Sequence, residues 1–262
     1  IYTWFWATLL PISNVAWRVA LGSATAGAVA CGLLAFLVSR GSSMMMEGIA
    51  DLKNINRRWE SAICMVSGFV AGTLLGFNGY MWSQSVIVEV YSLSVLSLVA
   101  VLLGLLRWTY APEQYRYLYL AFFMYGICFN NHQSLLVIAL SMEALVLVVQ
   151  PKLARALFFW NTVCYLGGLA IASMGYLKLL SENTPVFVIY NIIGLASAAL
   201  WVWLSWKTRL RMLELGRDLA LVGSVGYVAL LLGIITNYVD TFDDSRGGLL
   251  LVHLLGLGCI VA

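Results

Sequence analysis

Apolar residues in this chain gather in nine runs separated by short polar connections. A helix needs about 20 apolar residues to cross the ~30 Å hydrocarbon core of a bilayer. The pattern therefore predicts an all-α integral membrane protein, a polytopic helical bundle of about eight to nine transmembrane helices in a single domain, residues 1–262. The runs cover residues 16–39, 61–81, 86–108, 117–129, 134–149, 156–177, 186–206, 219–238 and 249–262.

The positions of the basic residues predict on which side of the membrane each connection lies. If the runs cross the membrane alternately and the first runs inward, only Arg18, Lys178 and Arg246 among 15 Lys and Arg residues fall on the outer side. The positive-inside rule strongly favours that orientation. The composition, 62% hydrophobic and 10% charged, agrees with residence in a bilayer.

Two further patterns predict packing rather than chemistry. Gly68, Gly72 and Gly76 recur on one face of a run, and small residues at that spacing let helix backbones approach closely in lipid. The connection at residues 41–60 carries three methionines beside charged residues. We expect it to be a loop along the cytoplasmic interface.

Glu89 is the first candidate for chemistry, because it lies between two runs joined on the outer side. If the second helix begins near Val86, the carboxylate lies about one turn inside it, where a charge is costly without a partner or a wet cavity. It either snorkels to the interface or lines an outward cavity. A cavity carboxylate would suit acid–base chemistry or the binding of sugar hydroxyls.

The second candidate is the polar stretch Asn130-Asn131-His132-Gln133. The preceding run, residues 117–129, would reach only about 20 Å as a helix, so we expect the turn to lie below the outer surface. It either reverses the chain with satisfied hydrogen bonds or forms a cavity wall. Because His132 and His253 are the only histidines, a His-rich metal centre is excluded.

The other polar groups leave alternatives open. Arg18 either snorkels at the outer interface or binds an anionic group such as a lipid phosphate. Asp240, Asp243 and Asp244 form a solvated loop or, less simply, hold a divalent cation. The five cysteines lie in apolar runs without a C-x-x-C pair, which favours packing over a disulfide or zinc site. No motif for ATP, NAD or nucleic acid occurs.

Three segments carry a family resemblance. They are Leu-Pro-Ile-Ser-Asn-Val-Ala-Trp-Arg-Val at residues 10–19, Trp82-Ser83-Gln84 followed by Val-Glu-Val-Tyr-Ser-Leu at 88–93, and Gly126 followed by Asn131-His132. In this order and spacing they resemble a bacterial domain-of-unknown-function family of multi-pass membrane proteins. That family is related to the protein O-mannosyltransferases of the GT-C glycosyltransferase superfamily. The resemblance covers roughly residues 1–150. The chain departs from the family pattern at Ala20, where Asn is usual, and at Gln133, where a second His is common.

The resemblance implies a GT-C-like glycosyltransferase of the bacterial inner membrane, with its active face on the periplasmic side. The donor would be a polyprenyl-phosphate-linked sugar such as mannose, and the acceptor a hydroxyl of a protein or glycan. No soluble cofactor is implied, and a divalent metal stays open. The main catalytic acid, the general base, would lie in a first outer loop after a first helix. Both would precede Ile1, so we expect this fragment alone to be inactive.

The resemblance also assigns roles to residues of this chain. Arg18 would bind the donor phosphate. Glu89 and His132 are supporting catalytic candidates. The substrate-binding candidates are Tyr91, Asn131, Gln84 and Trp82.

A transporter or flippase of a lipid-linked or small polar substrate is the alternative function. It would place polar residues near the membrane midplane, often at broken helices, whereas here they collect toward one face. A purely structural membrane subunit would leave Glu89 and the Asn-His turn without a purpose.

Overall fold

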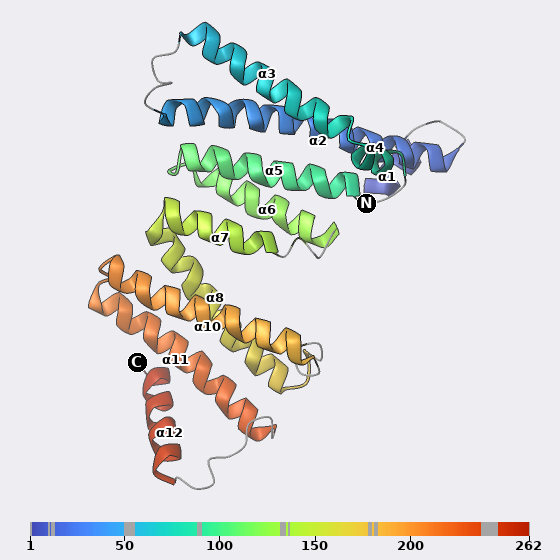
Figure 1. The fold of residues 1–262 in the computed structure, drawn as a ribbon. Helices are drawn as coiled ribbons and strands as arrows, with labels where there is room; N and C mark the ends of the chain where they lie inside the picture. The colour runs from blue at the N-terminus through green and yellow to red at the C-terminus, as the bar shows by residue number, and fades with distance from the viewer. Residues whose placement is uncertain are drawn as a thin grey trace. The chain divides into compact units, whose positions relative to one another are not determined.

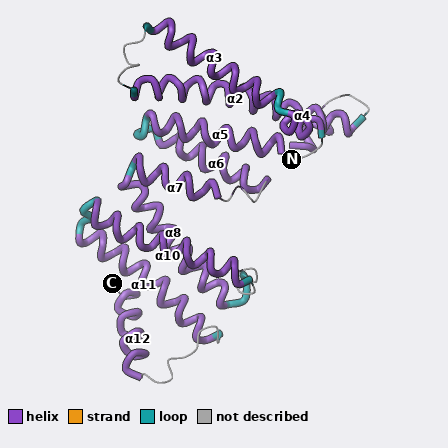
Figure 2. Tube along the Cα trace, viewed as in Figure 1, coloured by secondary structure: helices purple, strands orange, loops and turns teal. Residues whose placement is uncertain are grey.

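The chain is almost wholly helical in the computed structural model, which describes residues 2–9, 11, 14–49, 56–87, 91–131, 135, 137–177, 180, 183–236 and 246–261. No strand occurs among these residues, and short loops join the helices (Figure 2). The helices divide into two compact units, Ile1–Met142 and Glu143–Ala262. The prediction of an all-α membrane protein is confirmed, while that of a single domain stays a prediction.

Unit 1 is organised around one long helix (Figure 1). Its helices are α1 (Tyr2–Leu9), α2 (Val15–Gly48), α3 (Arg57–Gly76), α4 (Gly79–Val86), α5 (Tyr91–Tyr110) and α6 (Tyr115–Asn131). The helices α1, α3, α4 and α5 all pack on α2, and α6 packs on α5. Helix α7 (Val137–Val149) contains the boundary between the two units.

Unit 2 consists of α8 (Pro151–Ser173), α10 (Thr184–Lys207), α11 (Met212–Ile235) and α12 (Arg246–Val261). The contact between α8 and α10 combines glycines with tyrosines. Tyr165 donates a hydrogen bond to Asn191 Oδ1 at 2.7 Å, and Tyr190 donates one to the Tyr165 carbonyl at 2.9 Å. The Tyr165 ring lies against Gly194, where any side chain would collide with it. Tyrosine hydroxyls and glycines thus join these helices, together with the contact between the Phe159 and Trp201 rings.

Six of the described helices are long and apolar enough to cross a membrane, namely α2, α3, α5, α8, α10 and α11. The remaining predicted runs correspond to α6, α7 and α12, with 17, 13 and 16 residues. All nine predicted runs therefore match helices, although three of these helices are shorter than an average span.

Several predicted boundaries are wrong. Helix α5 begins at Tyr91 rather than near Val86, which is the last residue of α4. Helix α2 continues through Gly48, so residues 41–48 are helical rather than part of an interfacial loop. Its 34 residues extend about 51 Å. The run at residues 61–81 is broken, because Asn78 accepts hydrogen bonds from the Tyr80 and Met81 amides at 3.0 and 3.2 Å. This side chain caps a new helix, α4, in the usual way.

The glycine repeat brings α3 onto α2, as predicted. A Cβ atom at Gly68 would collide with the carbonyl oxygen of Ala35, and one at Gly72 would lie 2.9 Å from that of Cys31. Both obstacles are backbone atoms of α2, which cannot rotate away as a flexible side chain can. Lipid provides little hydrophobic drive for helix association, so this close approach is what stabilises the pair.

We expect Gly68→Ala to destabilise unit 1 by about 1–3 kcal/mol, since the added methyl group forces α3 away from α2. The measurement is the midpoint temperature for loss of the monodisperse peak in detergent. Gly126→Ala is the matched control, because its Cβ would meet no atom within 4 Å and alanine favours helix. Equal midpoints for the two variants would contradict the packing account.

Candidate functional site

The predicted site residues that the structure describes lie at one end of unit 1, here called the polar end. It is formed by α1, α4, the start of α2, the start of α5 and the end of α6. Ser23 of α2 lies 3.4 Å from the Gln84 carbonyl of α4, and Cys128 of α6 lies 3.7 Å from the Ser94 carbonyl of α5. These contacts connect segments that are up to 69 positions apart, as in the Ser23–Ser92 pair.

A buried cluster of serines joins α2, α4 and α5. The hydroxyl of Ser92 lies 3.2 Å from Ser23 Oγ, 3.4 Å from Ser85 Oγ and 3.3 Å from the Gln84 carbonyl oxygen. Ser92 is fully buried and Ser23 nearly so. A hydroxyl both donates and accepts, so the cluster satisfies itself. It fixes the position of α4 relative to the two longer helices.

Gln84 and Trp82 both lie on α4. The Gln84 side-chain oxygen is buried and has no hydrogen-bond partner among the described residues. Because a buried carbonyl oxygen without a partner costs free energy, this atom is suited to accept a hydrogen bond from a bound hydroxyl. Trp82 is exposed. The sequence analysis placed both residues in the connection between the runs at 61–81 and 86–108, whereas the structure places them on helix α4.

Arg18 is held in place by α1. Asn14 caps α2 by accepting a hydrogen bond from the Trp17 amide at 3.2 Å, and the Arg18 guanidinium donates one to the Ala7 carbonyl of α1. Its side chain is half-buried. Arg18 is thus fixed by contacts within the protein rather than extended freely into an interface.

Helix α1 is in turn fastened to α2 at Gly22, one turn after Arg18. The Tyr2 hydroxyl donates to the Gly22 carbonyl at 2.6 Å, and a Cβ atom at Gly22 would lie 2.7 Å from the Trp6 ring. Burial raises the pKa of Tyr2 above its usual value, which keeps the phenol protonated as a donor. Helix α1 has eight residues, too few to span a bilayer.

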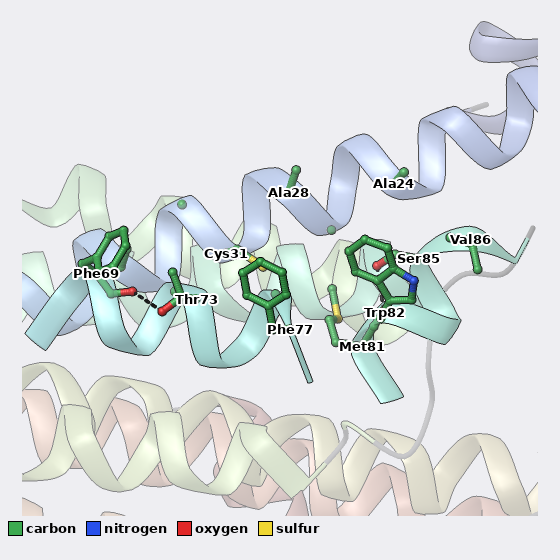
Figure 3. A pocket seen from close by; sticks show the side chains of 15 residues that line it. Ala24, Ala28, Cys31, Phe69, Thr73, Phe77, Met81, Trp82, Ser85 and Val86 are labelled. Carbon is green, nitrogen blue, oxygen red and sulfur yellow. Dashed lines mark hydrogen bonds between the residues drawn. The ribbon is translucent and has the colours of Figure 1, made fainter. Parts of the chain in front are cut away.

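An apolar groove of about 480 Å³ runs along α2, α3 and α4 to this end (Figure 3). Ala24, Ala28 and Cys31 line it from α2, with Phe77 and Trp82 on the opposite side. Ser85 lines the groove as well and belongs to the serine cluster. The groove therefore leads from the apolar middle of the helices to polar groups.

The other predicted residues fall partly outside the described structure. Tyr91 begins α5 and is half-buried. Glu89, three residues before Ser92, and His132 lie outside the described residues. Asn131 ends α6, three residues after Cys128, and its side chain also lies outside them. The roles predicted for these side chains stay predictions.

The short run that predicted a recessed turn is in fact a longer helix. Helix α6 includes Asn130 and Asn131 and has 17 residues, about 26 Å. The predicted end was taken from hydropathy, which shows only where the apolar side chains stop. The helix itself continues through the two asparagines. The polar pair is therefore helical rather than part of the turn.

No cluster of three or more His, Cys, Asp or Glu side chains suited to a metal occurs among the described residues. The acidic group Asp240, Asp243 and Asp244 lies outside them. Both alternatives for that group stay open.

Residues 1–156 match the family described as "Protein O-mannosyl-transferase TMEM260 N-terminal domain". The chain belongs to this family. The match covers all of unit 1 and confirms the predicted relation to the protein O-mannosyltransferases. No curated protein and no solved structure matches the chain. The bacterial branch and the GT-C superfamily stay predictions.

One carboxylate was missed by the sequence analysis. Glu143 lies within the apolar helix α7, is half-buried, and accepts a hydrogen bond from Asn161 Nδ2 of α8 at 2.8 Å. Acidic residues inside membrane helices are costly and commonly functional. The sequence signal was available, since Glu143 interrupts an otherwise apolar run. The serine cluster had no such signal, because lone serines are common in membrane helices.

We expect Gly22→Ala to detach α1, since the new methyl group would occupy the space of the Trp6 ring. Hydrogen exchange of the α1 amides should accelerate several-fold, as local opening becomes easier. Gly32→Ala, on the same helix but with no atom within 4 Å of its Cβ, is the control. Unchanged exchange in Gly22→Ala would show that α1 is not held at this position.

Proposed function

We propose that this protein is a membrane glycosyltransferase that moves a sugar, such as mannose, from a polyprenyl-phosphate donor to a hydroxyl of a protein or glycan. The observation that carries the proposal is the match of residues 1–156 to the protein O-mannosyltransferase family. The site lies at the polar end of unit 1. It faces the non-cytoplasmic side, an orientation supported by the distribution of basic residues.

The geometry of the polar end suits an amphiphilic donor. A polyprenyl phosphate needs an apolar surface for its chain and a cationic group for its phosphate. The groove along α2, α3 and α4 offers the apolar surface. Arg18, one turn before Gly22 on α2, offers the guanidinium, whose geometry matches phosphate oxygens.

The polar side chains suit the sugar and acceptor. The buried Gln84 oxygen can accept a hydrogen bond from a hydroxyl, and Trp82 offers an aromatic face on the same helix. Tyr91, Asn131, Glu89 and His132 complete the proposed pocket. The general base on the acceptor hydroxyl is a carboxylate, as the family resemblance implies.

In this reaction, a hydroxyl oxygen of the acceptor forms a bond to the anomeric carbon of the sugar. The bond from that carbon to the phosphate oxygen breaks, and the phosphate leaves with the electron pair. The base takes the hydroxyl proton. Arg18 stabilises the negative charge that develops on the departing phosphate, which is the kind of electrostatic assistance that lowers such barriers. No soluble cofactor is required, because the donor is already activated.

Glu89→Gln in the full-length enzyme should remove most transfer while leaving expression intact, since the amide cannot accept a proton or carry charge. The assay follows mannose from a radiolabelled polyprenyl-phosphate donor into acceptor. Glu113→Gln, in the α5–α6 connection, is the matched control at the other end of unit 1. A wild-type rate in Glu89→Gln would refute the role of Glu89.

Arg18→Ala should weaken donor use more strongly than acceptor use. Loss of a charge-assisted hydrogen bond of about 1.5–3 kcal/mol predicts a decrease of roughly 10- to 150-fold in kcat/KM for the donor. The kcat/KM for the acceptor, measured at saturating donor, should fall by less, since it reflects only the lost stabilisation of the departing phosphate and not the weaker binding of the donor. Equal losses for both substrates would point to displacement of α1 instead of loss of a phosphate contact.

A further inference from the structure

A second cavity lies at the opposite end of unit 1, here called the basic end, where α2 and α5 end and α6 begins. Its volume is about 600 Å³, within the usual range for small-molecule sites. Side chains of α2, α5 and α6 line it. None of them belongs to the polar end or its apolar groove.

Two guanidinium groups from different helices line this cavity, Arg40 of α2 and Arg107 of α5. Among the described residues, neither forms an ion pair with a carboxylate. Instead, Arg40 lies 5.3 Å from the Phe36 ring centroid, and Arg107 lies 5.3 Å from that of Tyr117. Aromatic rings orient a guanidinium without neutralising its charge, so both cations keep their capacity to bind an anion.

The inner part of the cavity, further along the helices from the two arginines, is apolar. Ala100 and Leu103 of α5 and Leu120 and Met124 of α6 line it, together with Phe36. These residues lie deeper in the helices than the two arginines, since Phe36 precedes Arg40 by one turn and Leu103 precedes Arg107 by one turn. Charge at the rim and apolar surface further in are the complement of a phospholipid.

Glu47 also lines the cavity, seven residues beyond Arg40 on the same face of α2. The order along α2 is therefore aromatic ring, cation and carboxylate. A phosphate at the arginines would direct its headgroup substituent toward Glu47. An ammonium group there would meet a favourable charge, whereas a further anionic group would be repelled.

We propose that the basic end of unit 1 binds one zwitterionic phospholipid, whose headgroup carries an ammonium group. Its phosphate lies between Arg40 and Arg107, its ammonium near Glu47, and part of an acyl chain against Ala100 and Leu103. This site is separate from the proposed donor site. It does not depend on glycosyl transfer.

The experiment is native mass spectrometry of the protein purified from membranes in mild detergent. It counts retained phospholipid and then compares added phosphatidylethanolamine, phosphatidylglycerol and phosphatidylcholine at equal concentration. The wild type should retain one phospholipid per chain and prefer phosphatidylethanolamine and phosphatidylcholine to phosphatidylglycerol. Arg40→Ala/Arg107→Ala should reduce retention at least about tenfold, as expected for lost charge-assisted hydrogen bonds.

The matched control is Arg58→Ala/Arg116→Ala. It removes two charges at the same end of unit 1 from residues that do not line the cavity, and it should retain lipid like the wild type. If both double variants lost bound phospholipid equally, general attraction between surface charge and lipid would explain the loss, and the proposal would be overturned. Retention by both would overturn it as well.

Two further variants test the cavity and the headgroup. Ala100→Trp should fill the apolar part and expel the lipid while leaving both arginines, so full retention would contradict a chain bound there. This variant also tests the site if the double arginine variant does not fold. Glu47→Gln should abolish the preference for phosphatidylethanolamine over phosphatidylglycerol. An unchanged preference would overturn the proposed orientation of the headgroup.

Discussion

Close packing on α2 is the constraint on which unit 1 depends. Among the described helices, α1, α3, α4 and α5 pack on this one, and they can do so because its buried face carries small residues such as Gly22, Ser23, Ala26 and Ala30. In a bilayer, burial of apolar surface does not by itself bring helices together, so contact at short range has to hold them. Each partner helix places a different group against these small residues. Helix α3 contributes its own glycines, α4 a serine, and α1 the Trp6 ring and Tyr2 hydroxyl.

This arrangement gives unit 1 two chemically distinct ends. At the start of α2, an apolar groove leads to a buried serine cluster, with Arg18 fixed by α1 a turn away. Toward its end, Arg40 and Arg107 line a cavity whose inner wall is apolar. Both sites combine an apolar surface with a guanidinium, which is the pattern expected for ligands that are themselves lipids. They differ in their neighbours, because the polar end has the buried serine cluster and the Gln84 side-chain oxygen, whereas the carboxylate of Glu47 lines the cavity at the basic end.

Much of the fold could be predicted from hydropathy and charge, because a membrane-spanning helix is recognisable in the sequence as a long apolar run. The glycine spacing predicted close packing on one face of α3, but only the structure shows that α2 is the partner. The break at Asn78 was missed, since an N-cap depends on one side chain that hydropathy does not reveal. The site was harder. Arg18, Gln84 and Tyr91 lie on helices that contribute to the polar end, but their predicted roles stay predictions. The serine cluster and the Glu143–Asn161 hydrogen bond could not be predicted, because they depend on side chains meeting across helices. The predicted reaction came from the family resemblance and not from composition. The family match over residues 1–156 agrees with the roughly 150 residues that the resemblance covers.

The most direct test of the central claim is an electron cryo-microscopy structure of the protein with a polyprenyl-phosphate mannose bound. The account predicts density for the phosphate beside Arg18, the sugar toward Gln84, and the polyprenyl chain along Ala24, Ala28 and Trp82. Donor density confined to the cavity of Arg40 and Arg107, or absent from the polar end at saturating donor, would contradict it.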